Sequence, residues 1–120
     1  MNIQTALFSA TVVCIVANVS VAVTDYARAG FVLKNSAEVH VPESALPYLA
    51  TLKLAGALGL VVGITAIPWL GVAAGVGLIL FFIGALVAHL RARVFYNIAF
   101  PGLYLILATA SAAYMIRVAA

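Results

Sequence analysis

The chain has 120 residues, enough for one domain and too few for two ordinary globular cores. Hydrophobic residues make up 67% of it and charged residues only 8%, whereas a soluble domain carries roughly a quarter charged residues. The net charge of +3 includes no basic run, and the single cysteine, Cys14, excludes an intramolecular disulfide. The composition therefore indicates a membrane protein and argues against nucleic-acid binding and self-contained dithiol chemistry.

Four apolar runs are long enough to cross the hydrocarbon core of a bilayer, which takes about 20 helical residues. They cover about residues 3–23, 46–67, 70–90 and 98–116, and a polar connection, 24–47, separates the first two. This pattern predicts an all-α polytopic membrane protein, an antiparallel bundle of four transmembrane helices that forms a single domain over residues 1–120. No Lys or Arg precedes the first run, which is also longer than the apolar part of a signal peptide, so we expect it to be retained.

The connections between the runs differ in length. Ile67, Pro68 and Trp69 leave almost no loop, so the second and third spans should form a tight hairpin, with Pro68 ending the second span. The connection 24–47 holds all three acidic residues and can form a short interfacial helix over residues 27–39. We expect Phe31, Val32 and Leu33 on its apolar face, and Lys34, Asn35 and Glu38 on a face toward water.

Lys and Arg near the span ends predict the orientation. Arg28, Lys34, Arg91 and Arg93 lie on the side of the first and third connections, and Arg117 lies on the other side. Cytoplasmic loops carry the excess of basic residues, so the four-to-one distribution predicts that both termini lie outside the cytoplasm.

Small residues recur every four positions in the second and third spans. They are Ala55, Gly59 and Gly63 in the second, and Gly71 and Gly75 followed by Gly84 and Ala88 in the third. Close backbone approach drives helix association in lipid, so these positions predict helix seams. The spacing fits either a homodimer or contact within one bundle, and the tight hairpin favours contact within the bundle.

Three polar side chains inside the spans are the candidate binding residues. By the 1.5 Å rise per residue, Asn18 and Lys53 lie about 9 to 10 Å below the same surface, and His89 closes the third span on that side. The alternative roles, which involve no ligand, are an interhelical hydrogen bond for Asn18, snorkelling for Lys53 and helix capping for His89. An amide, an ammonium and an imidazole are suitable donors to a quinone carbonyl or a lipid phosphate. Phe81, Phe82 and Phe95 are candidates to line an apolar route to that headgroup.

Other kinds of site lack the residues that they need. The two histidines and three acids show no metal-ligand spacing, and the glycines lie inside apolar runs rather than in a phosphate loop. No catalytic or metal-binding residue is expected. None of the predicted spans contains Asp or Glu, which argues against proton-coupled export through a membrane-embedded carboxylate.

Three segments, taken in order, resemble the DoxX-like membrane proteins of bacteria. They are the turn Val41-Pro42-Glu43-Ser44-Ala45-Leu46-Pro47, the helix start LKLAGALGL at 52–60 and the helix end AHLRAR at 88–93. The resemblance covers nearly the whole chain and implies a small four-helix protein of the bacterial cytoplasmic (inner) membrane. Most relatives have no established activity; the family name comes from a subunit of a thiosulfate:quinone oxidoreductase, and related proteins are implicated in membrane redox complexes or act as chaperones for membrane receptors. Many relatives have Glu where this chain has Lys53, so the resemblance transfers no catalytic residue.

The leading functional expectation is an accessory membrane subunit without catalytic activity of its own. It would pack against a larger membrane protein or a second copy, contact membrane lipid, and hold a quinone or a bound lipid at its polar end through Asn18, Lys53 and His89. The alternative is the membrane subunit of a quinone-linked oxidoreductase whose partner subunits carry the electrons. A small-solute carrier is the weaker third alternative.

Overall fold

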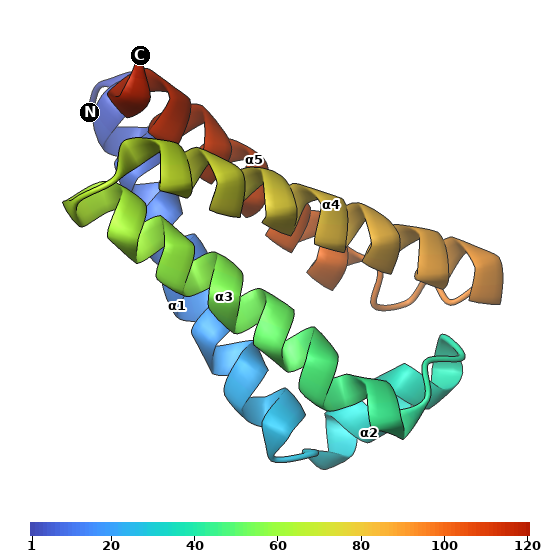
Figure 1. Ribbon diagram of the computed structural model, residues 1–120. Coiled ribbons are helices and arrows are strands. Elements are labelled where there is room, and N and C mark those ends of the chain that lie inside the picture. The colour runs from blue at the N-terminus through green and yellow to red at the C-terminus, as the bar shows by residue number, and fades with distance from the viewer.

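The computed structural model describes residues 1–120 as five α-helices and one short 3-10 turn (Figure 1). In chain order these are α1 (Ile3–Tyr26), α2 (Gly30–Glu38), η1 (Glu43–Ala45), α3 (Leu46–Thr65), α4 (Pro68–Ala92) and α5 (Ala99–Ala119). Four helical segments, α1, η1 with α3, α4 and α5, are long and apolar enough to cross a membrane. The expected all-α, four-span membrane fold is therefore confirmed.

Residues with special backbone chemistry determine where the helices begin. The Asn2 side chain caps α1 by accepting a 2.8 Å hydrogen bond from the Thr5 backbone N–H. The expectation that Pro68 ends the second span is wrong, because Pro68 is the first residue of α4 and the turn is made by Ala66 and Ile67. Proline suits this position since its fixed φ is helical and the first turn has no acceptor for its missing N–H.

The four long helices form two pairs that meet at one end. α1 packs against α3 and α5, and α4 packs against α3 and α5, so each long helix has two main neighbours. Figure 1 shows that the pairs converge near the two termini and the α3–α4 turn, and diverge toward the end where α2 lies. We call that end, where the α1–α3 connection and the α4–α5 turn lie, the polar end.

Side-chain size along the α3–α4 seam accounts for this divergence. Near the turn only hydrogen separates the backbones, since a Cβ added to Gly63 would collide with the Gly71 backbone. Each step away from the turn brings a larger side chain into the seam, which wedges the helices apart. The facing pairs, in order from the turn, are Gly63 with Gly71, Gly59 with Ala74, Gly56 with Leu78, and Lys53 with Phe81.

The seams are contacts between helices of one bundle, but two of the predicted positions do not belong to them. Ala55 is exposed, and nothing lies within 4 Å of a Cβ added to Gly84. Four residues advance a helix by about 400°, so a strict four-residue period drifts around the surface, and the stripe returns to the seam at Gly56 instead of Ala55. On the other side of α4, Gly75 packs against the Ala112 backbone of α5.

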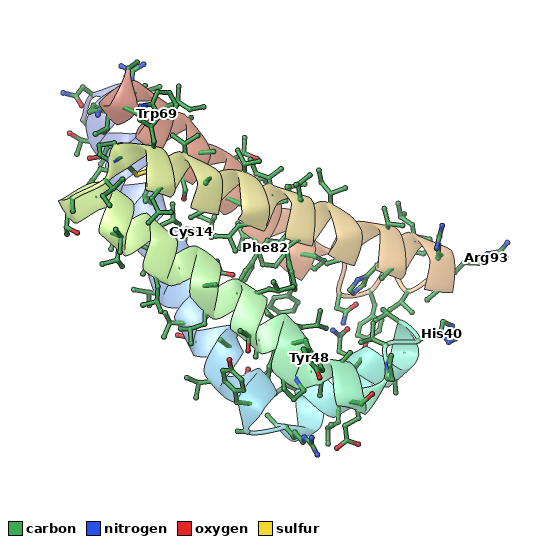
Figure 2. The ribbon with its side chains drawn as sticks, viewed as in Figure 1. Cys14, His40, Tyr48, Trp69, Phe82 and Arg93 are labelled. Carbon is green, nitrogen blue, oxygen red and sulfur yellow. The ribbon has the colours of Figure 1, made fainter.

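The apolar core occupies the middle and the converging half of the bundle. Its buried members are Cys14, Leu60, Leu78, Phe82, Ala108 and Met115. Figure 2 shows Cys14 and Phe82 between the two helix pairs. Cys14 is fully buried there and packs as a small apolar residue.

Candidate functional site

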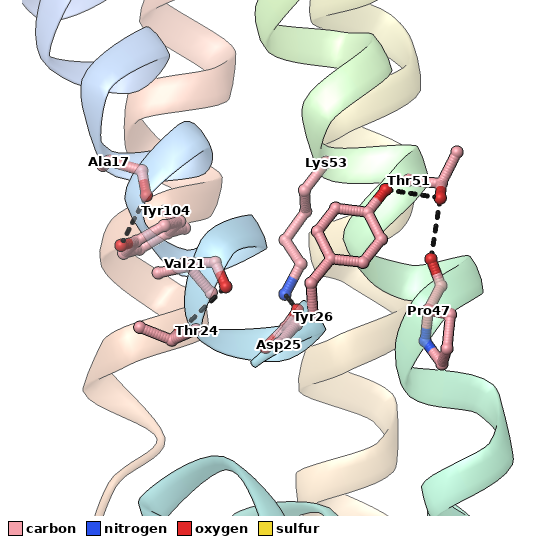
Figure 3. Close-up of polar contacts among 9 residues, drawn as sticks. All are labelled: Ala17, Val21, Thr24, Asp25, Tyr26, Pro47, Thr51, Lys53 and Tyr104. Carbon is pink, nitrogen blue, oxygen red and sulfur yellow. Dashed lines mark hydrogen bonds and ion pairs between the residues drawn. The ribbon is translucent and has the colours of Figure 1, made fainter. Parts of the chain in front are cut away.

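A buried ion pair joins α1 to α3 near the polar end. Lys53 donates from its ammonium to the carboxylate of Asp25, with 8% and 4% of the two residues exposed (Figure 3). Lys53 therefore does not snorkel to the headgroups but points into the protein, as intramembrane charges usually do. Its Nζ also lies 5.4 Å from the centre of the Phe81 ring, a cation–π distance.

Asp25 is the residue that the sequence-based interpretation missed. The apolar run ends at Val23, so Asp25 was assigned to the polar connection, but α1 continues to Tyr26 and places its carboxylate inside the bundle. A signal was present in the spacing. Steps of three or four residues from the buried end of α1 lead to Asp25, and the stripe consists of Thr11, Cys14, Asn18, Ala22 and Asp25.

Further hydrogen bonds lie beside this pair. The Tyr26 hydroxyl and the Thr51 hydroxyl are 2.6 Å apart, and Thr51 in turn donates to the Pro47 carbonyl at 2.7 Å (Figure 3). Because Thr51 gives its proton to Pro47, Tyr26 is the donor of the first bond. These hydrogen bonds hold α1 to α3 at the polar end.

Asn18 lies apart from the ion pair. It is fully buried, and its Nδ2 donates to the Cys14 carbonyl at 2.9 Å, while its Oδ1 has no partner. Asp25 lies seven residues further along α1, roughly 10 Å at 1.5 Å per residue. The expectation that Asn18 and Lys53 lie at one depth is wrong for their polar groups. A helical side chain leans toward the N-terminus of its own helix, and α1 and α3 are antiparallel, so the two polar groups point toward opposite ends of the bundle.

His89 lies in the last turn of α4 and is 4% exposed. Its Nδ1 is 3.0 Å from the Ala85 carbonyl, which can only accept, so Nδ1 carries the proton. Its Nε2 is buried without a partner. The structure thus does not bring Asn18, Lys53 and His89 into one cluster, and only His89 lies in the last turn of a long helix.

The helix α2 closes the polar end and differs from its expected orientation. Asn35 and Glu38 were expected to face water, but Asn97 donates to Asn35 Oδ1 at 2.8 Å and Tyr96 donates to Glu38. Of the residues expected on its apolar face, Val32 is buried, whereas Phe31 is 66% exposed. The hydrogen bond to the Glu38 carboxylate raises the pKa of Tyr96 above its ordinary value of 10.0. The partners of Asn35 and Glu38 are separated from them by about 60 residues, so no local pattern predicts this contact.

A cavity of about 410 Å³ opens between α4 and the turn that follows α2. This size is within the range of small-ligand pockets. The cavity is lined by Val39, His40, Val41, Gly84, Val87, Ala88 and Arg91. Of the three phenylalanines expected to line an apolar route, Phe82 is in the core and Phe95 is 57% exposed, whereas Phe81 contacts the ion pair.

Four helices that are long and apolar enough to cross a membrane, with buried polar residues between them, define a small polytopic membrane protein. The chain belongs to the DoxX-like family, whose family model matches residues 9–111. Comparisons with curated proteins and with solved structures give no match.

Proposed function

We propose that the protein is a non-catalytic accessory subunit of the bacterial inner membrane that holds a quinone or lipid headgroup at its polar end and packs against a larger membrane partner. The observation that carries the proposal is the buried acceptor atom of His89, Nε2, which has no partner in the chain. Buried polar atoms are nearly always hydrogen-bonded, so an unpaired one calls for an external partner. The cavity beside α4 provides space for a headgroup.

The other two proposed contact residues have different roles in this site. The free Oδ1 of Asn18 lies deeper in the bundle, where a longer ligand would reach it. Lys53 is neutralised by Asp25 and lies beside Phe81, outside the lining of the cavity. Packing against a partner is supported by the shallow groove on the lipid side of α3 and α4, whose small residues Ala55, Gly59 and Gly77 allow close approach of another helix.

Asp25 removes one argument against a small-solute carrier, because a buried carboxylate does lie within a span. A carboxylate that exchanges protons for a substrate has to separate from its counter-ion, however. The close pairing of Asp25 with Lys53 supports a structural role instead.

Purification in a gentle detergent, followed by mass spectrometry of co-purifying proteins and extracted small molecules, tests the proposal. We expect one larger membrane protein together with a quinone or a single lipid class near one molecule per chain. His89→Phe should retain less of the small molecule than the parent, whereas Thr11→Val, which alters a buried hydroxyl in the core-side half of α1, should retain as much. A chain that purifies alone and carries only bulk lipid would contradict the proposal.

A further inference from the structure

In four of the polar residues the donor nitrogen already has a partner within the chain. The Lys53 ammonium is paired with Asp25, and Asn18 Nδ2 donates to Cys14. His89 Nδ1 donates to Ala85. Asn97 Nδ2 likewise donates to Asn35.

The atoms left over are acceptors. Asn18 Oδ1, His89 Nε2 and Asn97 Oδ1 are all buried and have no hydrogen-bond partner. The assignment is firm for Asn18 and His89, because each faces a backbone carbonyl that cannot donate. A neutral imidazole with its proton on Nδ1 has a lone pair on Nε2.

Two of these acceptors lie at the same end of the bundle, His89 in the last turn of α4 and Asn97 in the turn before α5. Gly71 contacts Met115 and Phe82 contacts Tyr104, so facing residues of antiparallel α4 and α5 have numbers that add to 186. Extended two residues before the start of α5 at Ala99, the same register brings Asn97 to the level of His89. Both lie at the end that α2 covers, and Ala88, next to His89 in α4, lines the cavity between α4 and the turn 39–41.

From this inventory we infer that the polar-end site takes a ligand that donates hydrogen bonds, a hydroxyl-bearing headgroup, rather than one that offers carbonyl or phosphate oxygens. The inference rests on the proposed headgroup site and specifies its ligand: between the two forms of a quinone, the site prefers the reduced form, whose hydroxyl donates to His89 Nε2. A quinone carbonyl would instead place a second acceptor against His89 Nε2, which leaves both without a proton.

Binding of a matched pair of probes to the purified full-length protein tests the inference. Duroquinol and duroquinone share a ring and its methyl groups and differ only in hydroxyl against carbonyl. Measured anaerobically in detergent, duroquinol should bind at least about tenfold more tightly, which corresponds to one well-made hydrogen bond. Equal binding, or tighter binding of duroquinone, would overturn the inference and leave the headgroup site in place. Binding of neither probe would overturn both.

Variants of the chain test the acceptor atom and the cavity space separately. His89→Phe keeps a planar ring but no acceptor, so it should abolish the preference for duroquinol, whereas Gly84→Leu narrows the cavity and should weaken both probes alike. Thr11→Val should retain the preference. A preference that survives in His89→Phe would contradict the assignment of this acceptor.

A lipid headgroup is the other natural source of hydroxyl donors. Dioleoylphosphatidylglycerol carries two headgroup hydroxyls, and dioleoylphosphatidic acid has a bare phosphate. Displacement of duroquinol by the first lipid and not by the second would support a hydroxyl site that lipid also occupies. Displacement by phosphatidic acid alone would contradict the inference, since that headgroup offers mainly acceptors.

Discussion

Lys53 and Asp25 form an ion pair in which each charge lowers the free-energy cost of burying the other. Lys53→Met keeps the side-chain length but leaves the Asp25 carboxylate buried without its counter-ion. Breaking one side of a buried pair typically costs about 3–5 kcal/mol, so this variant should unfold at a clearly lower temperature. A snorkelling lysine would have given the opposite result, a slight gain in stability, because its removal would leave nothing unpaired.

The double variant Asp25→Asn/Lys53→Met is the control for this effect. It removes both charges, and replacing a buried pair by uncharged groups is often close to neutral. Thermal unfolding in detergent should therefore recover most of the stability lost in Lys53→Met. A double variant as unstable as the single one would show that the pairing is not the cause.

Tyr96 offers a pH-dependent readout of the contact between α2 and the α4–α5 turn. Its pKa is raised above the ordinary value of 10.0 mainly by its hydrogen bond to Glu38. Because the folded-state value is the higher one, the stabilisation is complete below pH 10 and is lost as the pH rises through the raised pKa. Glu38→Gln removes the carboxylate and should bring the phenol back toward its ordinary pKa.

Phenolate absorbance, taken as the difference between the parent and Tyr96→Phe, isolates this one tyrosine among five. The phenol in the parent difference spectrum should titrate at a higher pH than the phenol in the same difference spectrum measured in a Glu38→Gln background. Coincident titrations would show that Glu38 does not hold Tyr96 in solution.

At this scale the sequence identified Lys53 and His89 as polar side chains inside the spans, left snorkelling and helix capping open for them, and could not assign their partners. The burial of Lys53 follows from the high free energy of a charge in lipid, which any apolar run of this length imposes. Its partner depends on how far α1 continues beyond Val23, and the direction of each head group depends on helix polarity. Neither is encoded in hydropathy alone.

The glycines of α4 provide a matched pair at the scale of helix packing. A Cβ at Gly75 would lie 2.9 Å from Ala112 Cα, whereas nothing lies within 4 Å of a Cβ at Gly77. Gly75→Leu should therefore force α4 and α5 apart and destabilise the bundle by about 1–3 kcal/mol or more. Gly77→Leu should unfold close to the parent temperature, and a variant pair that unfolds alike would contradict the seam.

The existence and order of the helices could be predicted, because four runs of apolar residues separated by Pro and charged residues leave few alternatives. The orientation of α2 could not. Its hydrogen-bonding partners, Tyr96 and Asn97, come from the other half of the chain, and an amphipathic helix of nine residues presents its polar face as readily to protein as to water.

For the whole molecule, the distribution of Lys and Arg predicts the direction of insertion, with the polar end in the cytoplasm. In a Cys14→Ala background, an added cysteine at exposed Ser44 should be shielded from an impermeant thiol reagent in intact cells. One at Ala120 should react. The reverse labelling pattern would overturn the orientation, which five basic residues determine.

The divergence of the two helix pairs is a property of the whole molecule that cannot be predicted from any single segment. It follows from the order of residue sizes along the seam, from Gly63 facing Gly71 to Lys53 facing Phe81, and this order can be read only once the register of α3 against α4 is known. The open end of the bundle follows from that register.

Photo-crosslinking with a short-chain azidoquinol, followed by peptide mapping, tests most directly whether the polar end is the ligand site. We expect the label on residues 84–97 of α4 and the α4–α5 turn, or on residues 35–41, and we expect His89→Phe to reduce it. Labelling confined to the outer groove of α3 and α4, around Ala55, Gly59 and Gly77, would contradict a headgroup site at the polar end.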